Sequence, residues 1–492
     1  MKRKFGIILP VFSLPSKYGI GSFGKDAYDF IDFLHESKVS IWQVLPLGPT
    51  SYGDSPYQSF SAFAGNDYFI DLDFLIDEGL LTSDEVAQCD TQFEDKIDYG
   101  KLFVSRFEIL DKAAIRFRNN IPDDYYQFIK ENEKWLTDFA LFMSIKKTFG
   151  MISWLEWPEE YRLKDKQKID QFAEDHKDLI DHYYFCQYEF FKQWSAVKEY
   201  ANQKGIEIIG DVPFYVALDS SDVWGNRELF VLNEKGFPIE VAGVPPDYFS
   251  ETGQLWGNPI YDWENNKKDL YKWWRSRIKS SGKLFDYIRI DHFRGLDSFW
   301  AVPAGRPNAI EGEWKIGPGI RFIRYLKRSS RKIQLIAEDL GLLTPSVIKM
   351  LKDSRLPGMK VLEFAFSSDE DNEYLPETYP ENCVCYTGTH DNGPLKEWIN
   401  SLDEDASEFM SKYLKKKGLN PGIDGLIRLG MSSNARIFMV QLQDFLETDE
   451  NSRINTPGKE EGNWQWRVNP ELLNNQLSDR ISDLVVQYDR AK

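Results

Sequence analysis

The chain has few of the residues that mark an extracellular, membrane-spanning or nucleic-acid-binding protein. It holds four cysteines in 492 residues, far apart except for Cys383 and Cys385, so it has neither a disulfide framework nor a zinc-ligand spacing. It also has no long apolar run of the kind that crosses a bilayer. Lys and Arg number 60 against 78 Asp and Glu, and the net charge of -18 repels phosphate backbones and anionic lipids. We therefore expect no nucleic-acid and no membrane partner, and a neutral small molecule or polymer fits this charge better.

The first ten residues show only part of a secretion signal. Three basic residues precede the apolar run Phe5-Gly-Ile-Ile-Leu9, but Pro10 and Pro15 interrupt it and no small-residue cleavage site follows. We interpret this run as a first strand and expect a cytoplasmic protein.

Two further compositional features bear on the ligand. No Gly-x-Gly-x-x-Gly or Gly-x-x-x-x-Gly-Lys-Ser/Thr loop follows any predicted strand, so the usual marker of a nucleotide site is missing. Aromatic residues, in contrast, make up 15% of the chain, including 15 Trp and 24 Tyr. Such rings suit flat sugar surfaces, but composition alone favours the simpler reading that they fill a large core.

The predicted elements alternate between strand and helix, with two long interruptions. Residues 5–10 and 41–46 read as strands around an amphipathic helix over 22–38. An insertion over about 48–201 is mostly helical, and a second over about 212–265 is rich in Gly, Pro and Trp. The other predicted strands are 205–211, 287–291, 333–338, 359–364 and 383–387, with a weaker eighth near Ile454.

Eight strands separated by helices predict a single α/β domain over residues 1–492, a (β/α)8 TIM barrel. Its insertions are large and mostly helical, and no separate C-terminal β-domain follows. A doubly wound sheet is the alternative, but the missing phosphate loop disfavours it.

Acidic residues end four of the predicted strands. Asp211, Asp291, the pair Glu338-Asp339 and Asp391 each close an apolar run, as expected where parallel strands deliver side chains to the open end of a barrel. Arg289 lies two residues before Asp291 and so shares its face, where a guanidinium keeps the carboxylate ionised. Glu338 and Asp339 are adjacent and must diverge, and the residues alone leave open which one faces the site.

Carboxylates gathered at one barrel mouth suit the chemistry of glycosidic bonds. That chemistry uses one carboxylate as nucleophile, one protonated acid, and often a third anion that stabilises positive charge on the sugar ring. A metal site built from these acids with His292 and His390 is the competing interpretation, but the acids lie on separate strands and no closely spaced histidine pair occurs. A buried salt bridge or helix cap explains any single acid, but four strand ends in series make a wholly structural role improbable.

Three motifs closely resemble those of the amylomaltases, the 4-α-glucanotransferases of the α-amylase clan: Tyr287-Ile-Arg-Ile-Asp-His-Phe-Arg-Gly295, Ala337-Glu-Asp-Leu-Gly341 and Thr387-Gly-Thr-His-Asp-Asn392. Longer segments extend the resemblance along the chain: 47–66, 210–216, 243–259, 455–458 and 463–467. The match spans the whole protein, and its long central segment is more specific than any short motif.

The resemblance implies a role for each matching residue. Asp291 becomes the nucleophile, Glu338 rather than Asp339 the general acid/base, and Asp391 the transition-state stabiliser. The implied substrate-binding residues are Tyr57, Asp211, Gln254, Trp256, Arg289, His390 and Asn463, with Tyr248 and Phe249 in a lid loop that we expect to exclude water. No cofactor and no metal is implied. One departure is that Gly393-Pro394 follow Asn392 where the family usually has Asp-Thr.

The expected activity is that of a retaining 4-α-glucanotransferase, a hexosyltransferase that works through a covalent glycosyl-aspartate. Its partners would be α-1,4-glucans and malto-oligosaccharides as donors, with glucose or another glucan as acceptor. The alternatives are an α-1,4-glucan hydrolase of the amylase clan and a catalytically silent glucan-binding protein. The oligomeric state has no signal in the sequence.

Overall fold

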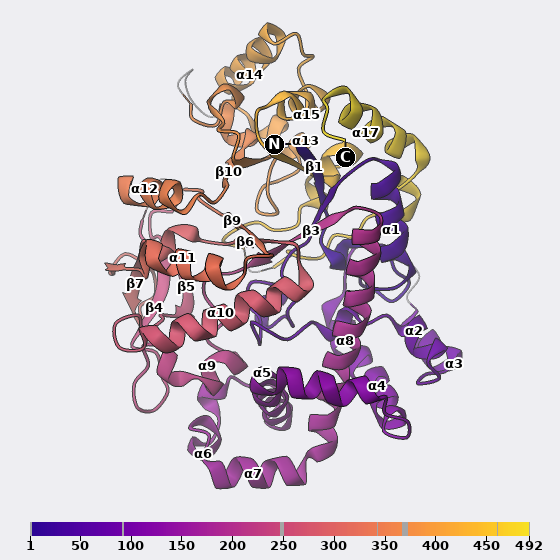
Figure 1. Ribbon diagram of the computed structural model, residues 1–492, viewed down its shortest axis with the longest axis vertical. Coiled ribbons are helices and arrows are strands. Elements are labelled where there is room, and N and C mark those ends of the chain that lie inside the picture. The colour runs from indigo at the N-terminus through magenta and orange to yellow at the C-terminus, as the bar shows by residue number, and fades with distance from the viewer. Residues whose placement is uncertain are drawn as a thin grey trace.

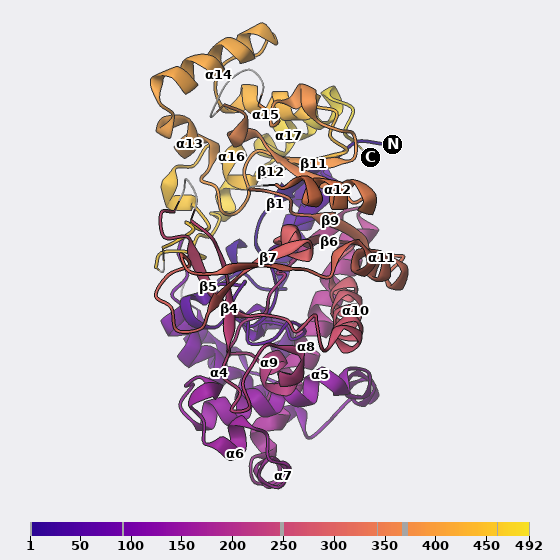
Figure 2. The ribbon, with the colours of Figure 1, turned by 90° about the vertical axis from the view of Figure 1, so that its left-hand side faces the viewer.

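The computed structural model describes residues 2–90, 93–246, 250–341, 343–366, 372–459 and 461–491. In Figure 1 the strands of a barrel lie in the upper half of the molecule, and a group of helices lies below it. The two ends of the chain come together beside the barrel in both views (Figures 1 and 2). The Arg490 guanidinium donates to the carbonyl of Lys4 at 3.1 Å, so the C-terminal segment is tied to the first strand.

Eight strands, all parallel to their neighbours, form the central sheet in the order β10-β11-β12-β1-β2-β3-β6-β9. Their bounds are β1 (Lys4–Ile8), β2 (Ile41–Gln43), β3 (Glu207–Val212), β6 (Tyr287–Ile290), β9 (Gln334–Ala337), β10 (Gly358–Val361), β11 (Cys383–Tyr386) and β12 (Ile437–Gln441). The predicted barrel class is therefore confirmed, and seven of its strands lie where the sequence predicted them.

The eighth strand was mislocated. It is β12, paired with β11 on one side and β1 on the other, whereas Ile454 lies in no strand. The run Ile437-Phe-Met-Val-Gln441 is apolar enough to be a buried strand, but helices adjoin it at both ends and no Gly or Pro ends it.

The barrel closes at a seam between β9 and β10, which do not form a ladder. The Ala337 N–H donates to the carbonyl of Pro357 at 2.9 Å, and the Met359 N–H donates to Asp339 Oδ1 at 2.6 Å. A side-chain carboxylate thus takes the place of one backbone acceptor at the seam.

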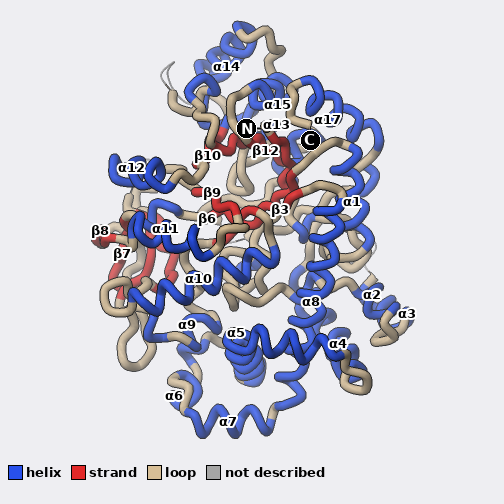
Figure 3. The backbone as a smooth tube through the Cα atoms, in the orientation of Figure 1, coloured by secondary structure: helices blue, strands red, loops and turns tan. Residues whose placement is uncertain are grey.

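Helices surround the sheet and fill the first insertion (Figure 3). Between β2 and β3 lie α2 (Leu72–Asp77), α3 (Ser83–Val86), α4 (Tyr99–Phe117), α5 (Asp123–Thr148), α6 (Glu159–Arg162), α7 (Lys166–Asp175) and α8 (Lys177–Gln203). A capping box begins α3, where Thr82 and Glu85 satisfy each other's backbone N–H groups. The remaining helices are α1 (Lys25–Glu36), α9 (Ser221–Gly225), α10 (Lys267–Leu284), α11 (Gly319–Ser329), α12 (Pro345–Ser354), α13 (Leu395–Ser401), α14 (Glu404–Lys416), α15 (Ile423–Ser432), α16 (Leu442–Leu446) and α17 (Asn475–Gln487).

A second, antiparallel sheet was not predicted. It has the order β5-β4-β7-β8 and is built from β4 (Glu240–Val244), β5 (Gln254–Pro259), β7 (Ser298–Pro303) and β8 (Glu313–Ile316). The segment 212–265 therefore carries strands as well as helix, and β5 brings predicted substrate-binding residues into this sheet.

The inside of the barrel is apolar at its middle level, where Ile8, Ile41 and Ile209 pack together, and charged near the carboxyl ends of the strands. Ile209 of β3 lies beside Tyr287 of β6, and two residues further along Asp211 lies beside Arg289. Because alternate residues of a strand share a face, Ile209 and Tyr287 lie inside the barrel directly beneath Asp211 and Arg289. None of the helices in the described part of the chain has the length and apolar character that crossing a bilayer requires.

Candidate active site

Three strand ends bring the predicted acids to one rim of the barrel. Asp291 follows β6 directly, Glu338 follows β9 directly, and Asp391 lies five residues beyond the end of β11. Because β6 and β9 are parallel neighbours in register, with Ile290 beside Ala337, Asp291 and Glu338 begin next to each other. The parallel topology thus places the two acids at the same opening.

Arg289 joins two of the acids through one nitrogen. Its Nη2 donates to Asp211 Oδ2 at 2.6 Å and to Asp291 Oδ1 at 2.9 Å. The Arg289 and Asp211 side chains are only 4% and 0% exposed, while 30% of Asp291 reaches the surface of the site. The guanidinium therefore orients Asp291 and balances two carboxylates in a buried layer.

Glu338 faces the site, and Asp339 does not. Glu338 accepts two backbone hydrogen bonds, from the His292 N–H at 2.7 Å and from the Leu340 N–H at 2.8 Å. His292 adopts left-handed backbone torsions, φ 50° and ψ 49°, in the turn that carries this N–H. Asp339 instead accepts the Met359 N–H at the seam. The two adjacent acids therefore point in different directions, with Glu338 toward the site and Asp339 toward the seam between β9 and β10.

Burial changes the proton affinity of the two acids. Loss of solvent raises the pKa of both Asp291 and Glu338, and neighbouring carboxyls raise it further. Arg289 lowers the pKa of both, and the two backbone N–H donors also lower that of Glu338, but the effect of burial is larger. The pair therefore retains a proton to higher pH than two free carboxyls would. Since Asp291 is the one that accepts a hydrogen bond from Arg289, we assign the retained proton to Glu338.

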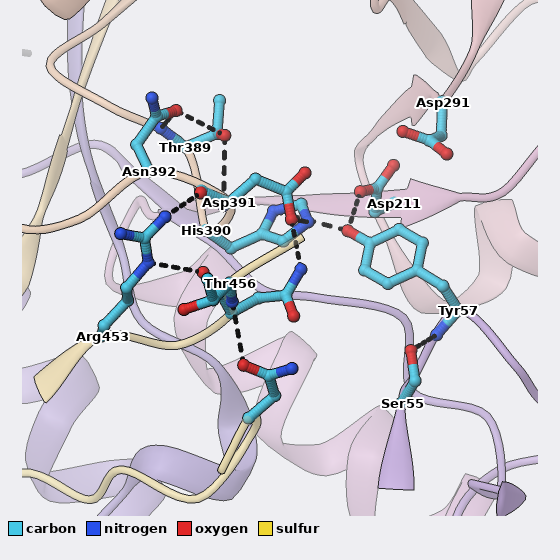
Figure 4. A network of polar contacts seen from close by, with 12 residues as sticks. Ser55, Tyr57, Asp211, Asp291, Thr389, His390, Asp391, Asn392, Arg453 and Thr456 are labelled. Atoms are coloured by element: carbon cyan, nitrogen blue, oxygen red, sulfur yellow. Dashed lines mark hydrogen bonds and ion pairs between the residues drawn. The ribbon is translucent and has the colours of Figure 1, made fainter. Parts of the chain in front are cut away.

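Asp391 comes from the opposite side of the opening (Figure 4). Its Oδ1 accepts from Asn455 Nδ2 at 2.6 Å and lies 3.4 Å from His390 Nε2. Its side chain is 47% exposed, the most open of the three acids. One oxygen of Asp391, Oδ1, is thus fixed by its neighbours, while the exposed part of the carboxylate remains accessible to a ligand.

His390 and Tyr57 form a stacked pair beneath the site. Their ring centroids lie 5.0 Å apart with planes 15° from parallel, and Tyr57 Oη donates to Asp211 Oδ2 at 2.5 Å. Burial lowers the pKa of His390, so the imidazole is neutral near pH 7. Burial and the nearby Asp211 raise the pKa of the Tyr57 phenol well above its ordinary value, which keeps it a donor.

The other predicted substrate-binding residues differ in what they contact. Trp256 is half-buried, donates through Nε1 to Gln254 Oε1 at 3.2 Å, and meets the His292 ring edge-on at 4.8 Å. Asn463 accepts from the Thr456 N–H at 2.9 Å and donates to the Lys459 carbonyl at 2.8 Å, so its amide holds its own loop. Tyr248 and Phe249, the predicted lid residues, lie outside the described residues.

Three further residues at this site were not predicted from the sequence. Arg453 Nη2 donates to the Asp391 carbonyl at 2.8 Å, Asn455 bonds the Asp391 carboxylate, and the Trp464 ring lies 6.0 Å from that of His390. Asn455 and Trp464 belong to segments that resemble the family, and this resemblance was the available signal. No local pattern connects these segments with β11, which lies more than 60 residues earlier in the chain.

The departure at Gly393-Pro394 has a local explanation. A Cβ at position 393 would lie 2.2 Å from Glu397 Oε2, so a side chain there would have to displace the end of the Glu397 side chain. Pro394 then caps α13. All three predicted carboxylates are present, so the change affects the loop after Asp391 and not the acids themselves.

No group of three or more His, Cys, Asp or Glu side chains in the described residues has the arrangement of a metal site. The geometry defines a (β/α)8 barrel with an arginine-bound aspartate, an adjacent half-buried glutamate and an opposing aspartate, the arrangement of enzymes that act on glycosidic bonds.

Comparisons with known proteins name the family within that class. A family model described as 4-alpha-glucanotransferase matches residues 9–474. The 4-alpha-glucanotransferase of Clostridium butyricum is 45% identical over 491 residues, which is 98% of this chain and 100% of the relative, and that of Streptococcus pneumoniae is 44% identical over 494 residues, 99% and 98%. An amylomaltase from Streptococcus agalactiae, solved in complex with acarbose, superposes with a TM-score of 0.96 at 38% identity and covers 100% of both chains. The chain belongs to the 4-alpha-glucanotransferase family.

Proposed function

We propose that Asp291, Glu338 and Asp391 divide the work of a retaining 4-α-glucanotransferase. The enzyme moves a segment of an α-1,4-glucan from a donor to the 4-hydroxyl of glucose or another glucan. The observation that carries the proposal is the pairing of β6 with β9, which sets the Arg289-bound carboxylate of Asp291 beside the half-buried Glu338.

In the first half of the reaction, Asp291 attacks the anomeric carbon of the donor. The bond from this carbon to the leaving oxygen breaks as the Asp291 ester forms, and the proton on Glu338 passes to the leaving oxygen. These roles of nucleophile and proton donor suit the surroundings of the two acids. Arg289 stabilises the ionised form of Asp291, while burial favours the protonated form of Glu338.

In the second half, Glu338 acts as the base. It takes the proton of the incoming 4-hydroxyl as that oxygen bonds to the anomeric carbon and Asp291 leaves. Each half inverts the configuration, so the product retains the α linkage.

The remaining residues hold the sugar at the reacting carbon. Asp391 stabilises positive charge on the ring, and His390, Tyr57 and Asp211 form the layer beneath it. Trp256 and Gln254 on β5 offer a ring face and an amide to an adjacent sugar.

Transfer requires that a sugar acceptor compete with water. Water at about 55 M faces an acceptor at a few millimolar, so acceptor binding must supply roughly 5 to 6 kcal/mol to equalise the two rates. Ring stacking, hydroxyl hydrogen bonds and exclusion of bulk water are the sources available. We propose Trp256 and Gln254 as contributors, with the lid residues Tyr248 and Phe249 as the predicted water barrier.

Incubation of the purified protein with maltotriose tests the proposal. Transfer gives a ladder of shorter and longer oligosaccharides, whereas the alternative hydrolase gives only glucose and maltose. Asp291→Asn is expected to remove the ladder, and Asp353→Asn, which alters an exposed ion pair with Lys349 on α12, serves as the matched control. An Asp291→Asn variant as active as the parent would favour the silent glucan-binding alternative.

We also propose a cytoplasmic location. All four cysteines are free and buried, which suits a reducing compartment. Cell fractionation with an antibody against the protein tests this, and recovery from the culture medium of intact cells would contradict it.

A further inference from the structure

The segment after β12 is bonded directly to the pair His390-Asp391. The Asn455 N–H donates to the His390 carbonyl at 3.1 Å, Arg453 Nη2 donates to the Asp391 carbonyl at 2.8 Å, and Asn455 Nδ2 donates to Asp391 Oδ1 at 2.6 Å. Two backbone carbonyls and one carboxylate oxygen are thereby held by two residues. We name Arg453 and Asn455 the C-terminal clamp.

Asp391 needs such support because it lies beyond the rigid part of its strand. Its own loop supplies a hydrogen bond from the Asp391 N–H to Thr389 Oγ1 at 3.3 Å and places His390 Nε2 3.4 Å from Asp391 Oδ1. On the far side of the loop, Asn392 is bound through Nδ2 to the buried Glu363 at 2.9 Å. Nearly half of the Asp391 side chain is exposed, so without the clamp its carboxylate would keep the longer His390 contact but lose its 2.6 Å hydrogen bond from Asn455.

Arg453 is itself fixed at three points. Besides the Asp391 carbonyl, its Nε donates to the Asn455 carbonyl and its Nη1 donates to Glu397 Oε1, both at 2.8 Å. Three acceptors lying around one planar guanidinium match the fork of an arginine and not the single ammonium of a lysine. Arg453 therefore fixes both the peptide of Asp391 and the residue that bonds its carboxylate.

Glu397 completes the arrangement from α13. Its second oxygen, Oε2, is buried with no hydrogen-bond partner among the described residues and lies against Gly393. Because a side chain at position 393 would displace Glu397, the glycine allows Glu397 to reach Arg453. This ties the unusual Gly393 to the placement of Asp391, two residues earlier.

We propose that Arg453, anchored by Glu397, is a positioning residue that sets the carboxylate of Asp391 for transition-state stabilisation. Arg453 acts through Asp391 and its backbone and touches no reacting atom. The inference rests on the proposed role of Asp391. Loss of this positioning role should lower kcat with little change in KM, because a misplaced stabilising charge weakens binding of the transition state more than binding of the donor.

The test compares Arg453→Gln and Arg453→Lys with the parent on maltotriose. We expect kcat to fall about 10- to 100-fold in both variants, as for other small misplacements of a reacting group, with KM within about twofold. Arg480→Gln is the matched control, because Arg480 also bonds a carbonyl and a glutamate, those of Phe445 and Glu447, away from the site, and it should keep the parent kcat. Should the glutamine variant fail to fold, the lysine variant, which keeps the charge facing Glu397, carries the test.

A double-variant cycle separates positioning from general support. In an Asp391→Ala background there is no carboxylate to position, so Arg453→Gln should change the residual kcat less than about twofold. An equal loss in both backgrounds, or a parent-like kcat in Arg453→Gln and Arg453→Lys, would overturn the inference. Full activity of Asp391→Ala alone would instead refute the proposed role of Asp391, so the two failures are distinguishable.

Discussion

Glu338 shows how one side chain is prepared for two opposite tasks. Both of its oxygens accept backbone N–H groups, which fix the carboxyl in place and lower its pKa, while burial has the larger effect and raises the pKa. A carboxyl that is held by the main chain keeps its position when it gains or loses a proton. This suits an acid that must become a base within one catalytic cycle.

The pH dependence of the first step follows from this pKa. Activity requires protonated Glu338, so kcat/KM for maltotriose should decline as pH rises through its raised pKa. Glu338→Gln should lower kcat/KM by about 10²- to 10⁴-fold and abolish that basic limb, because an amide has no proton to give. Initial rates from pH 4 to 9 provide the measurement.

The choice of donor supplies the control for this prediction. An aryl maltoside with a good leaving group needs little protonation, so Glu338→Gln should impair its cleavage much less than that of maltotriose. A basic limb that persists unchanged in the variant would show that another group is the acid.

At this scale the sequence predicted the residues of the centre but not those that support it. Arg289 and Asp291 share a face because strands alternate, and the structure has them bonded as expected. Glu338 and Asp339 could be distinguished only through the family resemblance, because an adjacent pair has no internal sign of which residue turns inward. Arg453 was not predicted because its contacts depend on tertiary folding.

Among the elements, the seam between β9 and β10 relies on a side chain where other strand pairs rely on a ladder. Asp339 Oδ1 accepts the Met359 N–H at 2.6 Å, and burial raises the pKa of Asp339 to about 6. The same turn that directs Glu338 to the substrate therefore directs Asp339 to barrel closure.

Removing this acceptor should destabilise the barrel. Asp339→Ala leaves the Met359 N–H without a partner, at a cost of about 1 to 3 kcal/mol, whereas Asp339→Asn keeps an oxygen and should lose less. Thermal unfolding followed by circular dichroism measures both variants. Equal losses for Ala and Asn would mean that the bond to Met359 contributes little.

Strand positions could be predicted where apolar runs end in Gly, Pro or an acid, and not elsewhere. The run at β12 has no such boundary, and β4 and β7 are short strands that pair across more than 50 intervening residues. Pairing of that kind depends on packing around the loops, so local pattern alone did not reveal the second sheet.

Across the whole molecule, most of the abundant aromatic residues fill the hydrophobic core. Six tryptophans are among the largest fully buried side chains: Trp42, Trp154, Trp157, Trp194, Trp224 and Trp274. Only a few rings, such as Tyr57, Trp256 and Trp464, lie at the site. The simpler reading of the composition therefore accounts for most of it.

Buried acids far from the site make global stability depend on pH. Glu189 on α8 is fully buried, 3.2 Å from Lys192 Nζ, and burial raises its pKa to about 7, with Glu78 raising it further and Lys192 opposing. An unfolded glutamate titrates near about 4.3. The folded state thus binds this proton more tightly, so the stability from this group is full below about pH 4 and is lost as pH rises through about 7.

Glu189→Gln should remove that loss. The melting temperature of the variant relative to the parent should rise from pH 5 to pH 8, and the change in relative free energy should not exceed about 3 to 4 kcal/mol. Glu199→Gln, at an exposed position on the same helix, is the control and should show no such trend. A relative melting temperature that falls over this range would contradict the assignment.

The sheet order also has a consequence for synthesis on the ribosome. Lys4 of β1 pairs with Ile437 of β12, so one side of the first strand waits until β12, the last strand in the described residues, is translated. At about 5 to 20 residues per second, that interval is on the order of 20 to 90 s. During this time the nascent chain exposes an unpaired strand edge, which makes it a natural client for chaperones until translation is almost complete.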